Sequence, residues 1–203
     1  MSRAAVFLDR DGNINRDVGY PNSYRSIDIY GYSFEAVRKL NQAGLSAIVI
    51  TNQSGVGRGL IEESQLREIH ARMSEDFLRQ GARIDAFYYC PHYTYSSDPR
   101  YKKDCSCRKP FPEMGLRAAQ DLDLDLNRSY VVGDKVEDIL FGQNIGANPI
   151  LVLTGYGETS RLRLMESEIH PAFIAAHLLE AVLWILAREN PGGKVSSDQG
   201  GRR

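Results

Sequence analysis

The stretch AAVFLDRDG (4–12) places a short apolar run directly before two carboxylates. Similar apolar runs follow at 45–51, 84–89, 129–134 and 149–155, and segments of helical period lie between them. This alternation is typical of βαβ units, in which crossover helices connect parallel strands. We therefore predict an α/β fold with a doubly wound, mainly parallel sheet of the Rossmann-like type.

The segments between the apolar runs predict five helices. Ser33 is expected to N-cap the first helix and Gly44 to end it. His70 lies within the second helix, where we interpret it as a surface residue. In chain order the predicted helices are 33–44, the one lined by Leu66, Ile69, Met73 and Phe77, 112–122, 136–144 and 172–188.

The length of 203 residues suits one domain, which we place at 1–188, and residues 189–203 are expected to be a disordered tail. A formal net charge of −1 gives no basic surface for nucleic acid or an anionic membrane. The N-terminus has no apolar leader, and the apolar C-terminal segment is too short and polar to span a bilayer. We expect a cytoplasmic monomer whose partner is a small molecule.

Two carboxylates, Asp9 and Asp11, follow the first predicted strand, and a third, Asp134, ends the fourth. The carboxyl ends of parallel strands meet at one edge of a sheet, so these groups are expected to lie together. Like charges in such a cluster repel each other unless a cation or a shared proton lies between them, and an oxygen-rich set suits Mg²⁺. In the alternative interpretation, Asp9 and Asp11 only cap the turn before Gly12.

Two further strand ends supply groups that are suited to an anion. Thr51 offers a hydroxyl at the end of the second strand, and the turn that begins at Asn52 offers backbone N–H groups. Lys109 supplies a fixed positive charge from the loop after the third strand. With Asp9, these residues would hold a phosphoryl group between a nucleophile and fixed donors, where its transfer develops charge.

Four short motifs occur in order, each at a predicted strand end or just beyond it: D-R-D-G (9–12), V-I-T-N (49–52), R-K-P (108–110) and G-D-K-x-x-D (133–138). Together they resemble the four motifs of the haloacid dehalogenase superfamily of phosphatases. The resemblance implies the haloacid dehalogenase fold and a Mg²⁺-dependent phosphoric monoester hydrolase.

The first Asp of that superfamily is its nucleophile, which implies that Asp9 attacks phosphorus and forms an aspartyl-phosphate. Asp11 would be the general acid for the leaving alkoxide and then the base that activates water. Thr51 and Lys109 would hold the phosphoryl oxygens. Mg²⁺ would be bound by Asp9, Asp134 and the backbone carbonyl of Asp11.

Three positions near these motifs need separate interpretation. Asn13 stands where the superfamily usually has Thr or Val, and it can close the turn through its side chain. Glu113 stands where related sequences commonly have Gly, and we expect it to face outward at the start of a helix, where a carboxylate is favoured. Asp138, one helical turn after Asp134, is assigned a supporting role.

The three cysteines of the chain lie in one loop together with a histidine. Cys90-x-His92 and Cys105-x-Cys107 supply the four ligands of a closed, structural zinc site. Three cysteines cannot all pair with one another, so disulfides do not account for the set. Their loop is polar, which argues against a set of buried thiols. A redox pair of Cys105 and Cys107 is the remaining alternative. We predict a zinc-binding loop at 90–107.

This loop also indicates a group within the superfamily. Small phosphatases without a large cap domain that carry a C-x-H…C-x-C-R-K-P loop act on D-glycero-D-manno-heptose 1,7-bisphosphate or on histidinol phosphate, and the long spacing here resembles the heptose group. The resemblance implies removal of the C7 phosphate, on the route to the nucleotide-activated heptose of lipopolysaccharide. Histidinol phosphate is the alternative substrate, and a zinc-stabilised binding module is the alternative without catalysis.

Carried over position by position, the resemblance also implies which residues contact the substrate. Arg108 can pair in a bidentate manner with the second phosphate of a bisphosphate. The implied substrate-binding set is Asp17, Gly19, Tyr20, Thr51, Asn52, Gln53, Ser54, Arg108, Lys109 and Lys135.

Overall fold

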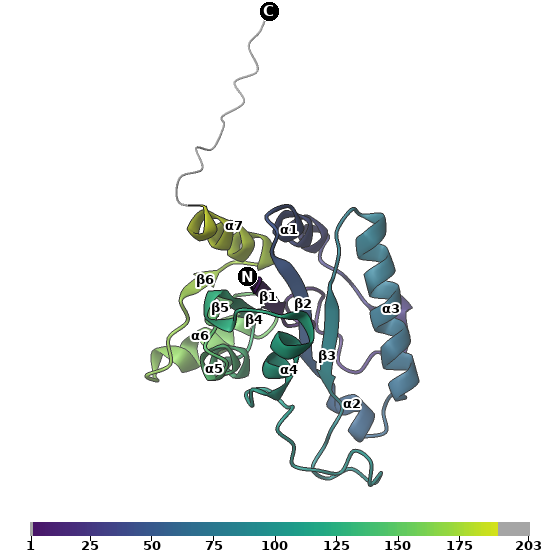
Figure 1. The fold of residues 1–203 in the computed structure, drawn as a ribbon. Helices are drawn as coiled ribbons and strands as arrows, with labels where there is room; N and C mark the ends of the chain where they lie inside the picture. Colours follow the sequence, from purple (N-terminus) through teal and green to yellow (C-terminus); the bar gives the residue numbers. More distant parts are fainter. Residues whose placement is uncertain (1, 191–203) are drawn as a thin grey trace, which may run out of the picture.

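The computed structural model describes residues 2–190 and shows a six-stranded parallel sheet with the order β3-β2-β1-β4-β5-β6 (Figure 1). From β1 the chain adds β2 and β3 on one side of the sheet, and then β4, β5 and β6 on the other side. The carboxyl ends of β1 and β4 therefore flank a topological switch point. This order confirms the predicted doubly wound sheet. The strands are β1 (Ala5–Leu8), β2 (Ser46–Asn52), β3 (Ala86–Cys90), β4 (Tyr130–Gly133), β5 (Asn148–Val152) and β6 (Phe173–Ala175).

Helices cover both faces of the sheet (Figure 1). One face packs against α1 (Gly31–Gln42), α3 (Glu63–Arg79) and α7 (Leu178–Glu189). The other face packs against α4 (Glu113–Leu122) and α5 (Val136–Asn144). The shorter elements are α2 (Ser54–Gly57), α6 (Gly157–Met165) and the 3₁₀ helices η1 (Tyr24–Ser26) and η2 (Leu126–Arg128).

The central strand β1 is buried on both faces, which explains its uninterrupted apolar sequence. Val6 and Leu8 belong to the core beneath α1 and α7, whereas Phe7 belongs to the core beneath α4 and α5. All three side chains are fully buried. Because β1 is fixed on both sides, the residue that follows it, Asp9, has a defined position.

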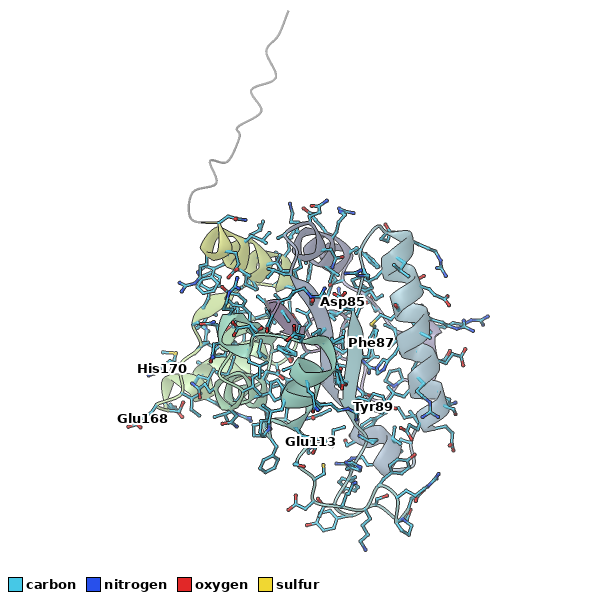
Figure 2. All side chains as sticks on the ribbon, in the orientation of Figure 1. Asp85, Phe87, Tyr89, Glu113, Glu168 and His170 are labelled. Atoms are coloured by element: carbon cyan, nitrogen blue, oxygen red, sulfur yellow. The ribbon has the colours of Figure 1, made fainter. Side chains whose placement is uncertain are left out.

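The edge strand β3 connects the sheet to α3 through two aromatic side chains. Phe87 and Tyr89 lie on the same side of this strand (Figure 2), where Phe87 stacks on His70 of α3 with ring centroids 4.6 Å apart. The Tyr89 hydroxyl donates a hydrogen bond of 2.7 Å to Glu63 at the start of α3. These contacts fix α3 beside the strand whose end leads into the cysteine loop.

Segment 172–188, which the sequence predicts as one helix, is a strand followed by a helix. Residues 173–175 form β6, which pairs with β5, and α7 begins only at Leu178. His177 caps this helix because its Nδ1 accepts a hydrogen bond of 3.3 Å from the Glu180 N–H. The prediction was wrong here because the apolar residues of the strand and the helix run together in the sequence.

Two other helix predictions differ from the structure. α1 begins at Gly31, so Ser33 lies inside the helix and not at its N-cap, and its hydroxyl donates to the Ile14 carbonyl (2.8 Å). The sequence does not predict α6, in which only Gly157, Ser160 and Leu164 are buried and no apolar stripe marks a helix.

Within residues 2–190, no inserted domain covers the carboxyl edge of the sheet. The two long connections at this edge, 9–30 and 91–112, contain no element longer than η1, in agreement with the predicted lack of a large cap. None of the helices in this range has the length and apolar character needed to cross a membrane. Glu189 still belongs to α7, and residues 191–203, where we predict a disordered tail, lie outside the described residues.

The packing of α7 provides a test of the fold that leaves the carboxyl edge untouched. Ile185 is fully buried against the sheet, so we expect Ile185→Ala to lower the free energy of unfolding by about 2–4 kcal/mol. Urea unfolding followed by circular dichroism measures this change. The matched control is Leu183→Ala in the same helix, where the side chain is 49% exposed and the expected loss is below about 1 kcal/mol. Equal losses in the two variants would show that this face of α7 does not pack as described.

Candidate active site

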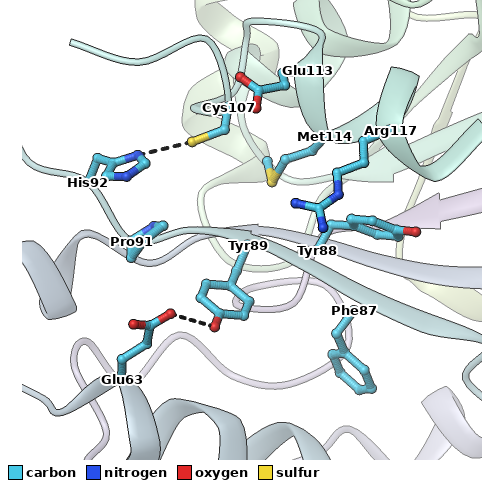
Figure 3. A pocket seen from close by; sticks show the side chains of 10 residues that line it. All are labelled: Glu63, Phe87, Tyr88, Tyr89, Pro91, His92, Cys107, Glu113, Met114 and Arg117. Atoms are coloured by element: carbon cyan, nitrogen blue, oxygen red, sulfur yellow. Dashed lines mark hydrogen bonds between the residues drawn. The ribbon is translucent and has the colours of Figure 1, made fainter. Parts of the chain in front are cut away.

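The predicted zinc ligands come together at the end of β3. One ligand atom each from Cys90, His92, Cys105 and Cys107 lies within 4.8 Å of the other three. The cysteines form no disulfide, and Cys105 Sγ lies 3.4 Å from the sulfurs of both Cys90 and Cys107. The fourth side closes through His92 Nδ1, which lies 3.1 Å from Cys107 Sγ (Figure 3). Three sulfurs and one imidazole nitrogen at this spacing fit a tetrahedral zinc ion, whose soft ligands these are.

The protonation of this cluster depends on whether a cation is bound. Contact with Cys90 and burial raise the pKa of the Cys107 thiol, and burial is the main cause of the raised pKa of Cys105. These thiols are therefore neutral at physiological pH as long as no cation lies among them. A bound metal would reverse this preference, because it requires deprotonated thiols.

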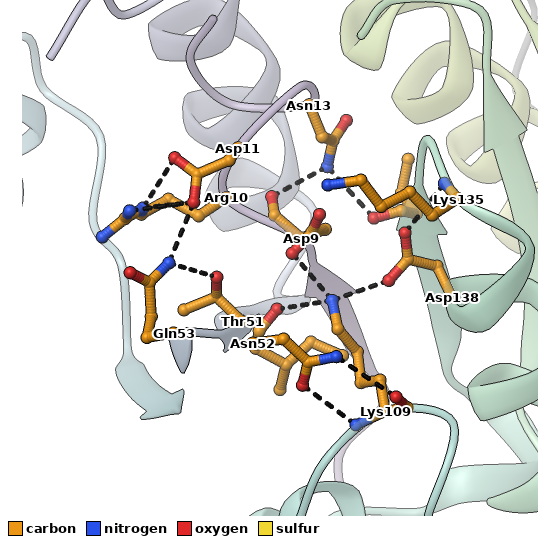
Figure 4. Close-up of polar contacts among 12 residues, drawn as sticks. Asp9, Arg10, Asp11, Asn13, Thr51, Asn52, Gln53, Lys109, Lys135 and Asp138 are labelled. Atoms are coloured by element: carbon orange, nitrogen blue, oxygen red, sulfur yellow. Dashed lines mark hydrogen bonds and ion pairs between the residues drawn. The ribbon is translucent and has the colours of Figure 1, made fainter. Parts of the chain in front are cut away.

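The cysteine loop ends two residues before Lys109, whose ammonium group is buried beside the end of β1. Its Nζ lies 2.7 Å from Asp9 Oδ1 and 2.6 Å from Asp138 Oδ1, and it donates to the Ile50 carbonyl at 3.1 Å (Figure 4). Burial alone would lower the pKa of Lys109, but the charges of Asp138 and Asp9 outweigh burial and raise it. Lys109 is therefore a permanent cation inside the site.

The backbone of Lys109 is held by Asn52, at the end of β2. The side-chain oxygen of Asn52 accepts from the Lys109 N–H at 3.0 Å, and its amide group donates to the Lys109 carbonyl at 3.2 Å (Figure 4). The sequence assigns Asn52 to the substrate. The structure shows that its side chain also positions Lys109.

Asp9 and Asp134 are buried carboxylates that face each other at the switch point. Burial raises the pKa of Asp9 to about 6, with the charge of Asp138 adding to the shift and that of Lys109 opposing it. Burial and the charge of Asp9 raise the pKa of Asp134 to about 8. Asp134 Oδ2 accepts the Tyr156 N–H at 2.7 Å, whereas its buried Oδ1 has no hydrogen-bond partner.

This arrangement fits a hard cation. Oxygens of Asp9, Asp134 and Asp138 lie within 4.8 Å of one another. Both oxygens of Asp138 are engaged, one by Lys109 and the other by the Lys135 N–H at 3.0 Å, so Asp138 supports the site as predicted. The unpartnered Oδ1 of Asp134 and the carboxylate of Asp9 are left as the oxygen ligands that Mg²⁺ prefers.

Two glycines allow the chain to pass close to Asp134. Gly12 has φ +89° and Gly155 has φ +56°, and a Cβ atom on either would lie 2.2 Å from Asp134 Oδ2. Neither position can therefore carry a side chain without displacing this carboxylate. The motif residue Gly12 is required by this approach as well as by its turn.

The carboxylate of Asp11 points away from the Asp9–Asp134 pair into a set of hydrogen-bond donors. Arg10 donates from Nε and from Nη2 (2.8 Å), and Gln53 donates at 2.9 Å (Figure 4). Asn15 donates at 3.0 Å. Burial alone would raise the pKa of Asp11, but the charge and hydrogen bonds of Arg10 lower it. The same Gln53 amide also donates to the Thr51 hydroxyl (2.9 Å), which links Asp11 to the predicted phosphoryl-binding residue.

The prediction that His70 is a surface residue was wrong. Its side chain is buried, and its Nε2 lies 3.1 Å from Arg10 Nη1. Burial lowers the pKa of His70 to about 3, so its imidazole is neutral. The signal was present in the sequence, because position 70 lies four residues after Leu66 and so on the same face of the helix.

The two departures from the superfamily pattern have structural explanations. Asn13 is fully buried, and its amide donates to the carbonyls of Asp9 (3.1 Å) and Val132 (3.0 Å), which ties the end of β1 to β4. Glu113 is exposed in the first turn of α4 and contacts the Ser106 hydroxyl, so its charge lies outside the site.

A cavity of about 660 Å³ opens above these residues at the carboxyl edge of the sheet. Every residue that the sequence assigns to the substrate lines it: Asp17, Gly19, Tyr20, Thr51, Asn52, Gln53, Ser54, Arg108, Lys109 and Lys135. Asp9, Asp11 and Asp138 also line it. The structure thus brings the predicted nucleophile, acid and cations to one cavity.

Sequence reasoning missed two aromatic residues of this cavity, Phe111 and Tyr156. The Tyr156 ring lies 4.9 Å from the Lys135 ammonium, which in turn lies 3.4 Å from Asp17. Tyr156 follows the end of β5, so the rule that ligands bind at strand ends would have identified it. Phe111 lies four residues after Cys107, the last predicted zinc ligand, and has no comparable signal.

The raised pKa values predict how stability depends on pH before magnesium is added. The folded state binds protons on Asp9 and Asp134 that the unfolded chain has released, so stability falls as pH rises through about 6 and 8. We expect Asp134→Asn to reduce this fall between pH 5 and pH 8 by on the order of 1–3 kcal/mol. Urea unfolding in magnesium-free buffer measures it, with the exposed Asp121→Asn as control. An Asp134→Asn variant with the pH dependence of the wild type would contradict the assignment.

Comparison with known proteins places this geometry in a family. Residues 106–181 match a family model described as HAD-hydrolase-like. The chain is 41% identical over 154 residues to D-glycero-β-D-manno-heptose-1,7-bisphosphate 7-phosphatase of Pasteurella multocida, covering 75% of this chain and 83% of that protein. It is 39% identical to the Escherichia coli K12 protein of the same name, covering 74% and 80%.

Solved structures agree with these sequence relatives. The D,D-heptose 1,7-bisphosphate phosphatase from B. bronchiseptica, complexed with magnesium and phosphate, superposes with a TM-score of 0.79 at 30% identity, covering 91% of this chain and 99% of that one. The corresponding enzyme from Burkholderia thailandensis gives a TM-score of 0.67 at 30% identity, with 91% and 99% covered. The chain belongs to the D-glycero-β-D-manno-heptose-1,7-bisphosphate 7-phosphatase family of haloacid dehalogenase-type phosphatases.

Proposed function

We propose that this protein hydrolyses the C7 phosphate of D-glycero-β-D-manno-heptose 1,7-bisphosphate, which yields the 1-phosphate and inorganic phosphate. The observation that carries the proposal is the buried Lys109 ammonium between Asp9 and Asp138, at the base of a cavity lined by further cations. Family membership supports the substrate, and the names of the relatives support the β anomer. The product belongs to the predicted route to nucleotide-activated heptose.

In the first half of the reaction, the carboxylate of Asp9 attacks the C7 phosphorus and the bond between phosphorus and the C7 oxygen breaks. Asp11 must first bind a proton, because Arg10 lowers its pKa in the empty site, and it gives this proton to that oxygen as the alcohol leaves. Lys109 is already fixed 2.7 Å from Asp9, so its charge faces the phosphoryl oxygens without reorganisation. The Thr51 hydroxyl would donate to one of these oxygens.

In the second half, water attacks the phosphorus of the aspartyl-phosphate and Asp11 accepts a proton from it. The bond between phosphorus and Asp9 breaks, which releases inorganic phosphate and regenerates the free carboxylate. Asp11 thus donates one proton and recovers one, so the cycle balances. Its hydrogen bonds to Arg10, Asn15 and Gln53 keep its carboxylate at the wall of the cavity between the two transfers.

We also propose two metals with different roles. Asp9, Asp134 and the backbone carbonyl of Asp11 would hold Mg²⁺, which neutralises charge on a transferring phosphoryl group. Phosphatases of this superfamily use Mg²⁺, and the B. bronchiseptica structure contains magnesium and phosphate. The four Cys and His side chains would hold zinc, with no position open for substrate.

The second phosphate distinguishes this substrate from a monophosphate. Arg108 is exposed at the cavity wall beside Lys109, and Lys135 lines the same cavity. A planar guanidinium can bind the C1 phosphate with two hydrogen bonds. Histidinol phosphate has no second phosphate to occupy this group.

We expect the wild-type protein to release phosphate faster from the β-1,7-bisphosphate than from the α anomer, and much faster than from histidinol phosphate. Steady-state kcat/KM for each substrate, measured by phosphate release with Mg²⁺ present, provides the ranking. Asp9→Asn should abolish turnover and retain the fold, because an amide cannot replace the nucleophilic carboxylate. A preference for histidinol phosphate, or turnover by Asp9→Asn, would reject the proposal.

The zinc site gives a separate prediction. Cys107→Ser should lose bound zinc and lower kcat/KM by about tenfold or more, because Cys107 fixes the chain two residues before Lys109. Metal analysis of the purified protein and kinetics with saturating Mg²⁺ provide the two measurements. Ser106→Ala, between the two ligands, should keep both zinc and activity. Wild-type activity in a zinc-free Cys107→Ser protein would show that zinc does not position Lys109.

A further inference from the structure

Arg10 lies between Asp9 and Asp11 in the sequence, and its charged side chain is completely buried. Its guanidinium has no exposed surface, yet it is too large and too charged to be a favourable core residue. Nε and Nη2 form a fork on the carboxylate of Asp11. This fork accounts for only one edge of the guanidinium. The remaining Nη1 also carries two N–H donors that need a partner in the interior.

His70 provides that partner. Its Nε2 lies 3.1 Å from Arg10 Nη1. Arginine can only donate, so Nε2 must present its lone pair, and the ring proton must be on Nδ1. A neutral imidazole is the form that burial favours, in agreement with the lowered pKa of His70. The contact is therefore a hydrogen bond from a buried cation to a neutral acceptor, and it defines the direction in which the guanidinium lies.

The His70 ring is itself fixed. It stacks on Phe87 of β3 with centroids 4.6 Å apart and an interplanar angle of 17°, and the edge of Tyr89 packs against it at 5.6 Å. Its backbone belongs to the long helix α3. A continuous series of contacts thus runs from α3 and the edge strand through His70 and Arg10 to the carboxylate of Asp11.

We propose that His70 is a positioning residue for Asp11, which acts by holding the Arg10 guanidinium and, through it, the Asp11 carboxylate in its place at the wall of the cavity. The inference rests on the proposed function, because it assigns Asp11 the proton transfers described above. The His70 side chain is buried behind Arg10 and does not line the cavity, so it would act on the substrate only through Arg10 and Asp11.

This role has a signature that simple loss of stability lacks. An alkyl phosphate, such as the C7 ester of the heptose, needs a proton on its leaving oxygen, whereas p-nitrophenolate leaves without one. kcat/KM covers the steps up to departure of the leaving group. Misplacement of Asp11 should therefore lower kcat/KM for the alkyl ester and spare the aryl ester.

The test compares three variants. His70→Phe keeps an aromatic ring against Phe87 but removes the acceptor, and His70→Gln can present an oxygen near the former Nε2. Met73→Ala is the control, because Met73 is buried on α3 one turn away and its truncation leaves a cavity without touching Arg10. Each variant is assayed with the heptose bisphosphate and with p-nitrophenyl phosphate, and its thermal unfolding is recorded.

We expect His70→Phe to lower kcat/KM for the bisphosphate by about tenfold or more, which corresponds to the loss of one hydrogen bond from a charged donor. Its kcat/KM for p-nitrophenyl phosphate should stay within about twofold of the wild type. His70→Gln should recover most of the loss, and Met73→Ala should be less heat-stable with unchanged kinetics. An equal fall for both substrates, or no fall in His70→Phe, would overturn the proposal.

The same experiment separates this inference from the proposed substrate. If the wild-type protein does not hydrolyse the heptose bisphosphate but does hydrolyse another alkyl phosphate, the substrate assignment fails. The comparison of leaving groups is then made with that ester, and the role of His70 is still decided by the ratio of the two kcat/KM values.

Discussion

The site depends on one buried cation. Lys109 Nζ lies 2.7 Å from Asp9 and 2.6 Å from Asp138. These carboxylates are buried at the carboxyl edge of the sheet, where uncompensated charges would be strongly destabilising. The ammonium group allows two carboxylates to be buried near Asp134, and it leaves one of them, Asp9, directed into the cavity. The same charge that stabilises the empty site would stabilise a phosphoryl group, so preorganisation here is a consequence of folding.

Two parts of the chain far apart in sequence keep Lys109 in place. Asn52 binds its backbone from β2, and the cysteine loop ends two residues before it. The proposed zinc would therefore act on catalysis only through the position of Lys109. Arg10 and His70 serve Asp11 in a comparable manner from the opposite side, so nucleophile and acid are each supported by buried polar contacts.

The sequence predicted the residues at the strand ends because parallel strands bring their carboxyl ends to one edge whatever their order. Asp9, Thr51 and Asp134 needed only that rule and the motifs. The sequence could not show that Asn52 binds Lys109, because that contact depends on how the cysteine loop folds back. The position of His70 four residues after Leu66 indicated the buried face of the helix, but its contact with Arg10, sixty residues away in the sequence, could not be predicted. β6 was missed because a strand of three residues gives no period.

The proposed reaction requires a covalent bond between Asp9 and the transferred phosphorus. The direct measurement is acid quenching during turnover of a bisphosphate labelled at its C7 phosphate, followed by reduction of the acyl-phosphate and peptide mapping. We expect label on the protein during turnover and the reduced residue at Asp9, with none in the presence of product alone. A protein that releases labelled phosphate without ever carrying it, or that carries it on another residue, would contradict the account.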